Sequence, residues 1–129
     1  MEDIFGNGVK LTEKVLDNLW LREEITQDNI ANVDTPGYKS KYLTFEEELE
    51  NRIKTANASD RARTHIAAAI DGFSAHVHTT VSESSRLDGN SVDMDQEQVD
   101  LAKNALEYQY MVNSVSNELK RLDTAAKTF

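Results

Sequence analysis

Three histidines are the residues of this chain with the clearest capacity for chemistry. His76 and His78 are two residues apart, so both imidazoles would point to the same side of a β-strand, with Asp71 nearby in sequence. His65 stands alone upstream. A protein metal site needs three or four ligands held by supporting contacts, and the surrounding segment consists largely of small polar residues. We therefore interpret the histidines as surface residues and predict no metal site and no cofactor.

Adjacent carboxylates, at 23–24 and 46–48, are the candidates for acid–base chemistry. Such chemistry needs burial that separates two pKa values, and these residues occupy the polar faces of predicted helices. The chain has no cysteine, which excludes disulfides, thiolate catalysis and thiolate metal sites. No glycine-rich phosphate loop and no Ser/His/Asp arrangement can be assembled. The sequence therefore predicts a protein that is not an enzyme.

Charge and hydropathy narrow the class of partner. The 129-residue chain carries a net charge of −9, which argues against binding to nucleic acid or to an anionic membrane surface. Residues 1–11 lack the basic start and apolar core of a secretory signal, and no apolar run approaches the roughly 20 residues of a membrane span. By these signals alone the chain would be cytoplasmic, without direct insertion into a membrane.

The elements that must position these residues begin with a long helix. Over 8–33 the chain has no proline, and many apolar residues recur at spacings of three and four. Pro36 disfavours a helical conformation in the residue before it, and Gly37 can supply the positive φ of a type II turn. The helix should therefore end here. The pattern then predicts extended chain over 39–45 and a short acidic helix over 45–54.

The segment 55–90 has no sustained period. It holds a small apolar island at 66–70, and 76–81 alternates weakly enough to predict one strand. Alone, such a segment buries too little apolar surface to offset its conformational entropy. We expect a mobile loop or a small, weakly packed insert.

The final segment, 91–129, carries the clearest pattern, because its apolar residues step by four and three as in a coiled coil. We call the following residues the heptad stripe: Leu101, Ala105, Tyr108, Val112, Val115, Leu119 and Leu122. Asp93 or Asp95 can cap the start of this helix, with Gln96 or Gln98 completing a capping box. A helix over 95–127 would be about 50 Å long.

That length decides the predicted architecture. A small domain is only about 30 Å across, so the helix must lie along another long helix. The partner is either the N-terminal helix, in an antiparallel or splayed hairpin, or helices of neighbouring subunits. The predicted fold class is mainly all-α, with long terminal helices forming a coiled-coil or helical hairpin around a poorly ordered or small β-containing middle. Residues 1–54 and 91–129 would form one domain, interrupted by a variable, flexible 55–90.

The run around the turn resembles the signature of the flagellar rod, hook and hook-associated proteins. It consists of Asn29, Ile30, Ala31, Asn32, Val33, Asp34, Thr35, Pro36, Gly37, Tyr38 and Lys39. In that family the run closes the N-terminal helix and turns the chain. Asn29 and Asn32 can bond free backbone groups at the helix end. Residues 85–97 and 104–110 are similar to short proximal-rod members of the same family.

The resemblance covers about 8–54 and 85–127, and it implies a structural subunit of the proximal rod of the bacterial flagellar basal body. Such subunits pack terminal helices into a tube and transmit motor torque, so the heptad stripe would be the assembly seam. The implied partners are the chain itself, other rod proteins, the basal-body ring and its adaptor, and the flagellar type III export apparatus. The implied location is the rod, outside the cytoplasmic membrane, reached without a cleaved signal peptide.

A second implication concerns export. Phe45 and Leu49 fit the Phe-x-x-x-hydrophobic pattern of a rod or hook export signal. The same i, i+4 pair is also expected on an ordinary short helix.

Two other hypotheses remain. A cytoplasmic coiled-coil adaptor or chaperone-like binding module would form a well-folded small oligomer, whereas a rod subunit would be mostly monomeric and polymerise at high concentration. A small metal-dependent enzyme using the histidines would require metal to co-purify.

Overall fold

The computed structural model of this chain describes residues 6–58, 61–81 and 86–128. In chain order the elements are α1 (Gly6–Ala31), β1 (Lys41–Thr44), α2 (Glu46–Asn57), α3 (Ala62–Asp71), β2 (His76–Thr79) and α4 (Met94–Lys127). Two long terminal helices therefore enclose a middle with one small sheet, which confirms the predicted fold class.

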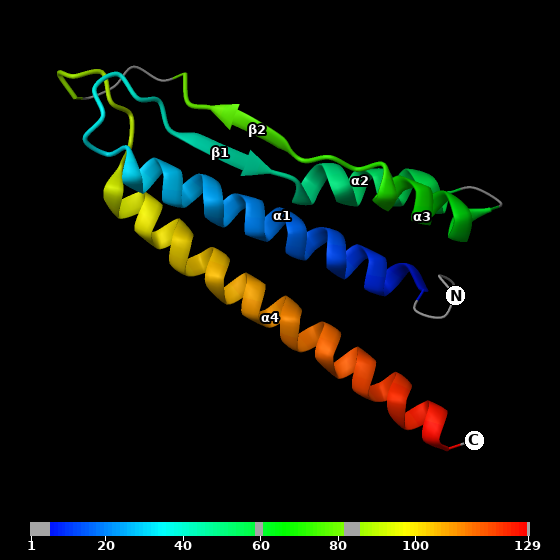
Figure 1. The fold of residues 1–129 in the computed structure, drawn as a ribbon. Coiled ribbons are helices and arrows are strands. Elements are labelled where there is room, and N and C mark those ends of the chain that lie inside the picture. The colour runs from blue at the N-terminus through cyan, green and yellow to red at the C-terminus, as the bar shows by residue number, and fades with distance from the viewer. Residues whose placement is uncertain (1–5, 59–60, 82–85, 129) are drawn as a thin grey trace.

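The two terminal helices form an antiparallel hairpin that opens toward the free ends. Figure 1 shows α1 between α4 on one side and the sheet with α2 and α3 on the other. The end of α1 lies beside the start of α4, and the two helices diverge from there. At 1.5 Å per residue, α1 is about 39 Å long and α4 about 51 Å. The splayed hairpin was one of the two arrangements predicted, and its C-terminal arm extends beyond the rest of the fold.

The sheet has two antiparallel strands. Lys41 pairs with Thr79 at one end and Thr44 with His76 at the other. The predicted extended stretch over 39–45 and the weak strand over 76–81 are both confirmed. This sheet holds the chain that follows the turn against α1.

The core lies where α1, β1 and the start of α2 meet the chain after α3. Its buried apolar side chains are Leu19, Ile25, Leu43, Phe45, Leu49 and Phe73. Burial of these side chains supplies the main favourable free energy of the fold. The core is small, in a chain of which 39% of the residues are hydrophobic.

The middle segment is more structured than the expectation of a loop or weakly packed insert. The apolar island at 66–70 lies in α3, where Ile70 is 1% exposed, and Phe73 just after it is 2% exposed. Because α1 and α2 supply the apolar partners, α3 needs no strong periodicity of its own. Helix α2 also continues past residue 54 to Asn57. The division of the chain into domains stays a prediction.

The start of α4 is capped by Asp93. Its carboxylate accepts hydrogen bonds from the backbone N–H of Asp95 at 3.1 Å and of Gln96 at 3.2 Å. This matches the first of the two predicted caps. The reciprocal half of a capping box is not made, because the side chain of Gln96 donates to Asp100 at 2.9 Å instead.

Candidate functional site

The predicted turn lies directly against the stretch that leads into α4. Tyr38 N–H donates to the carbonyl of Thr35 at 3.2 Å, and Gly37 between them has φ +72°, as a type II turn requires. Gly37 N–H donates to the Asp88 carbonyl at 2.8 Å. Gly89 has φ +77°, and a Cβ there would lie 3.6 Å from Gly37 Cα. Two glycines therefore let the backbone of the turn after α1 approach the backbone that leads into α4.

Asn90 fixes this approach. The side chain is 1% exposed, and its Nδ2 lies 2.8–3.0 Å from the carbonyl oxygens of Asn32, Val33 and Thr35. Its Oδ1 accepts from Val92 N–H at 2.8 Å. One amide therefore binds three backbone carbonyls of the turn that follows α1.

Asn29 makes a second connection, from the last turn of α1. Its Oδ1 accepts from Lys41 N–H at 2.9 Å and from the Tyr38 hydroxyl at 3.1 Å. Its Nδ2 donates to the Lys41 carbonyl at 2.7 Å and to Glu97 Oε1 at 3.0 Å. The side chain is 1% exposed, so this fully bonded amide ties α1, β1 and α4 together. We call the contacts of Asn29 and Asn90 the joint.

Titration at the joint reflects its partial burial. Burial raises the pKa of Glu97, and the charges of Asp100 and Asp93 add to that rise, while the hydrogen bond from Asn29 opposes it. Burial also raises the pKa of the Tyr38 hydroxyl, with contributions from the charges of Asp28 and Glu97. Ionised Glu97 is therefore less favourable in the folded chain than in water.

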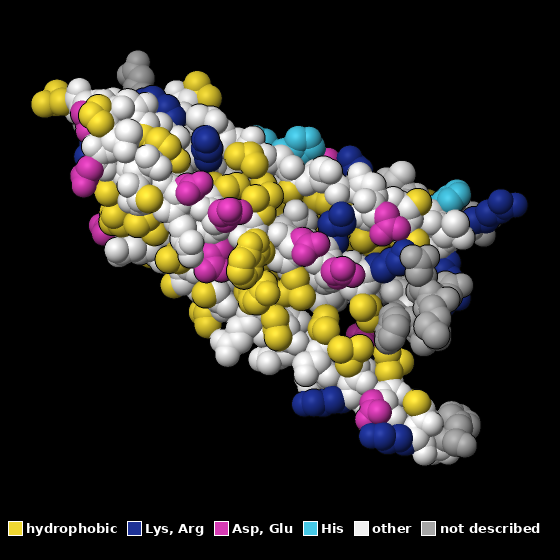
Figure 2. All heavy atoms as spheres, in the orientation of Figure 1, with side chains coloured by type: hydrophobic (Ala, Val, Ile, Leu, Met, Phe, Trp, Pro, Cys, Tyr) yellow, Lys and Arg dark blue, Asp and Glu magenta, His cyan; other side chains and the backbone are white. Residues whose placement is uncertain are grey.

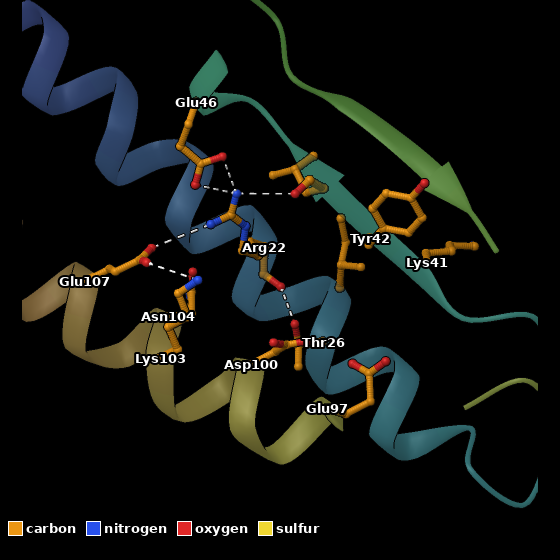
Figure 3. Close-up of a pocket in the computed structure, with 12 residues that line it drawn as sticks. Arg22, Thr26, Lys41, Tyr42, Glu46, Glu97, Asp100, Lys103, Asn104 and Glu107 are labelled. Atoms are coloured by element: carbon orange, nitrogen blue, oxygen red, sulfur yellow. Dashed lines mark hydrogen bonds and ion pairs between the residues drawn. The ribbon is translucent and has the colours of Figure 1, made fainter. Parts of the chain in front are cut away.

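Arg22 links the same three layers nearer the middle of α1, in a polar hollow of about 410 Å³ (Figure 3). Its guanidinium lies 2.7 Å from Glu46 and 3.6 Å from Glu107, and it donates to the Leu43 carbonyl at 3.3 Å. It also lies over the ring of Phe45, 4.6 Å from the centroid. Burial raises the pKa of Glu46, but Arg22 and backbone hydrogen bonds outweigh it, so the net pKa is lowered.

Asn104 is the buried polar residue between α1 and α4. It is 2% exposed, and its Nδ2 donates to the Leu19 carbonyl at 2.9 Å. Its Oδ1 meets no donor among the residues that the structure describes. An amide at such a position favours one alignment of the two helices, because sliding one along the other would separate it from the Leu19 carbonyl.

The motif residues predicted from the resemblance converge on the joint, with different tasks. The Asn32 side chain donates to a carbonyl at the helix end, that of Asp28 at 2.8 Å, which also accepts from the Asn32 backbone N–H at 3.1 Å. Asn29 does not bond the helix end, because its side chain points inward to β1 and α4. Ile30 is half-buried; Ala31, Thr35 and Pro36 are exposed. The side chains that connect elements are therefore Asn29 and Tyr38.

The heptad stripe divides into two sets. Leu101, Tyr108 and Val115 are half-buried, whereas Ala105, Val112, Leu119 and Leu122 are exposed. The face of α4 that meets α1 is rotated from the stripe and passes through Glu97, Leu101, Asn104, Tyr108 and Met111. The isolated chain uses only part of the stripe, and the role of the stripe in assembly stays a prediction.

An apolar groove lies beside this contact, with a volume of about 360 Å³. We call it the apolar groove; its apolar lining is Val15, Leu19, Phe45, Leu106, Tyr110 and Met111, with Glu46 and Glu107 beside them. Leu106 is 69% and Tyr110 72% exposed. Figure 2 shows hydrophobic side chains gathered between α1 and α4 and continuing along α4 toward its C-terminal end.

The remaining predicted residues are occupied within the fold. Phe45 and Leu49 are both buried in the core, so the candidate export signal is inaccessible in the folded chain. His76 Nδ1 lies 3.1 Å from Glu48, and His78 Nε2 lies 2.9 Å from the Thr44 hydroxyl. Over the described residues, no cluster of three or more potential metal ligands is found, and no helix is long and apolar enough to cross a membrane.

Sequence reasoning missed Arg22, and it named the run 104–110 by its resemblance without predicting roles for Asn104 or for the groove residues Leu106 and Tyr110. A signal existed for the last two, because they are large apolar side chains outside the heptad stripe. No local signal marks Arg22, since its partners are 24 and 85 residues away along the chain.

No protein-family model matches this chain. Individual proteins do match, over nearly its full length. It is 34% identical to the flagellar basal body rod protein FlgB of Borrelia hermsii, with 97% of this chain and 99% of that protein covered. It is 30% identical to FlgB of Escherichia coli K12, with 93% of each chain covered. FlgB of Bacillus subtilis is 26% identical, with 94% of each chain covered.

Proposed function

This chain belongs to the FlgB family of flagellar basal body rod proteins, and we propose that the exposed part of its heptad stripe makes the contacts between rod subunits. As a member of the family it is a structural subunit of the flagellar basal body rod and associates with other basal body components. The comparisons give no support to a coiled-coil adaptor.

The observation that carries the proposal is the uneven burial of α4. Its first half packs on α1, whereas every described residue from 117 to 128 is exposed. Leu119 and Leu122 nevertheless continue the apolar stripe there. Contiguous exposed apolar surface is costly in a monomer, so a helix of this kind is suited to burial against another subunit.

The joint would fix the direction in which α4 projects from the rest of the fold. Asn29 and Asn90 make four hydrogen bonds that hold the end of α1 and its turn against the chain around the start of α4. Torque passing along a rod pushes its subunits sideways. Buried, fully bonded amides resist rotation of α4 relative to α1 under such a load. The proposed function is therefore mechanical and not catalytic.

The finer location and partners are part of the proposal. We place the subunit in the proximal rod, in contact with copies of itself, other rod proteins and the ring and adaptor at the rod base. The chain would reach this position through the flagellar type III export apparatus, without a cleaved signal peptide. Since Phe45 and Leu49 are buried in the fold, they could act as an export signal only before folding.

The test is the motility of a strain carrying Val112→Asp and Leu119→Asp, two exposed positions of the stripe. We expect normal export of the variant and loss of swimming, because the new charges would be buried at the subunit contact. The matched control is Asn113→Asp with Asn117→Asp, which adds the same charge to exposed positions of the same helix. If the stripe variant swims as well as the control, the stripe is not a rod contact.

A further inference from the structure

We propose that the apolar groove receives the distal half of α4, residues 112–127, from a second copy of this chain. The inference rests on the proposed function and deepens it by naming the partner segment and its receptor. Four observations carry it: the shape of the groove, the surface of the distal half, their charges, and the geometry of a contact between two different surfaces.

The groove is a suitable receptor because three elements form its walls. Val15 and Leu19 come from α1, Phe45 from the start of α2, and Leu106 and Tyr110 from α4. The side chains on α4 are largely exposed, while Leu19 and Phe45 at the base are buried. An amphipathic helix binds such a groove by inserting apolar side chains at i, i+3 or i+4.

The distal half of α4 has the side chains that such a groove needs. Leu119 and Leu122 are three residues apart on one face and are 44% and 36% exposed. Val115 precedes them by one turn and is half-buried. Beyond Ser116 every described residue is exposed, so this part of the segment is available to a partner.

Charge favours the same pairing. Residues 112–129 hold three basic and two acidic residues, in a chain whose net charge is −9. Within the described part of the chain, Lys120 and Arg121 form no ion pair. At 100° per residue each lies about 130° from the centre of the leucine face, so each charge would reach a rim only through its long stem. Glu46 and Glu107 line the groove but are paired with Arg22, and an adjoining hollow, also lined by Glu46, includes Glu47. Glu47 likewise has no ion pair within the described residues.

The two surfaces lie at different places on one molecule. Leu106 and Leu119 are thirteen residues apart on α4, which corresponds to about 20 Å along the helix. A contact between them is therefore intermolecular and heterologous, and such a contact builds an open chain of subunits unless its rotation closes a ring. An open, helical array is the arrangement that a rod requires.

Disulfide cross-linking tests the contact, because the native chain has no cysteine. In the double variant Leu106→Cys with Leu119→Cys, one chain cannot bridge its own cysteines, since disulfides need Cα atoms within about 7 Å. We expect a ladder of linked multimers under mild oxidation at high protein concentration. Each single variant alone should stay monomeric, and an equal mixture of the two should give dimers. Val81→Cys mixed with Leu119→Cys is the control, because Val81 is exposed outside both surfaces.

Charge reversal adds an independent readout. Lys120→Glu with Arg121→Glu should lower the yield of mixed dimers several-fold, and Glu47→Lys on the groove-bearing chain should restore part of it. Equal yields in all combinations would overturn the role of charge in the pairing.

Three outcomes would overturn the inference. Dimers of a single variant would show a contact between like surfaces, and a yield no higher than the Val81 control would show that the groove does not bind α4. In isolated basal bodies, linkage of Leu119→Cys to a different protein and not to a second copy would assign the groove another occupant. A different result would contradict the proposed function itself: a motile strain whose rods do not contain this chain.

Discussion

The first and second halves of α4 have similar apolar periodicity but very different surroundings. From Met94 to about Met111 the helix is capped by Asp93, bonded to α1 through Asn104 and joined to the turn through Glu97. From Val112 onward, the side-chain hydrogen bonds and ion pairs among the described residues stay within the helix itself, such as the pair of Lys127 and Asp123 at 2.6 Å. The same pattern therefore has two uses: folding in the first half and, by our proposal, assembly in the second.

The sharpest way to test this difference is to remove the joint. Asn29→Ala should lower the free energy of unfolding by about 3 kcal/mol, because it leaves several buried donors and acceptors around β1 and α4 without partners. Urea denaturation of the isolated chain measures the change. Asn113→Ala, at an exposed position of the distal half, is the control and should be neutral. Equal effects would show that the two halves do not differ in stability.

A smaller effect is expected at the close approach of the two turns. Gly89→Ala should cost about 1–2 kcal/mol, since φ is +77° there. Gly8→Ala is the matched control, because Gly8 lies in α1 with no atom within 4 Å of an added Cβ, and alanine favours the helix by about 1 kcal/mol. Thermal unfolding should move in opposite directions for the two variants. A neutral Gly89→Ala would show that the turns are not held together in solution.

A smaller effect again concerns Glu97. Its pKa is raised in the fold, so the folded chain holds this proton more tightly than the unfolded chain does. The ionised group therefore reduces stability at neutral pH, and the penalty fades as pH falls through the raised pKa toward the ordinary value of 4.5. Glu97→Gln keeps an acceptor for Asn29 and should raise the melting temperature slightly at pH 7 but not at pH 4. Glu24→Gln, at an exposed position of α1, is the control for the removal of one negative charge.

The smallest effect on folding should come from the distal half itself. Leu119→Asp should change the free energy of unfolding of the isolated chain by less than about 0.5 kcal/mol, as is usual for exposed positions. Hydrogen exchange should likewise be faster for amides beyond residue 112 than for those over 97–111. A loss of more than 1 kcal/mol would mean that the distal half is already packed in solution, which would contradict its availability to a partner.

The parts of this fold that follow local rules could be predicted from the sequence. The end of α1, the turn at Pro36-Gly37, the cap at Asp93 and the weak strand at 76–81 each depend on neighbouring residues, and each was found. The register between α1 and α4 could not be predicted, because it depends on Asn104 meeting a backbone carbonyl 85 residues away. Helix α3 was missed for a related reason, since its burial depends on surfaces supplied by α1 and α2.

The candidate site shows the same limit. The motif run identified Asn29, Tyr38 and Gly37 as important, but their geometry depends on a second stretch, around Gly89 and Asn90, that closes over them. The heptad stripe marked an apolar face correctly as a pattern, yet the face that packs on α1 is rotated from it, because Asn104 and Met111 occupy the inner positions. A one-dimensional pattern cannot distinguish which part of a wide apolar face is covered by the chain itself.

The single hydrogen bond from Asn104 to Leu19 has a consequence for length. Sliding α4 along α1 by one helical turn would displace the arm by about 5.4 Å and separate this buried amide from its carbonyl. The distance by which α4 projects is therefore a fixed dimension of the folded chain. If a neighbouring subunit binds the projecting end, the repeat distance between subunits is set by the register of α4 on α1 within each monomer. The buried amide of Asn104 fixes that register.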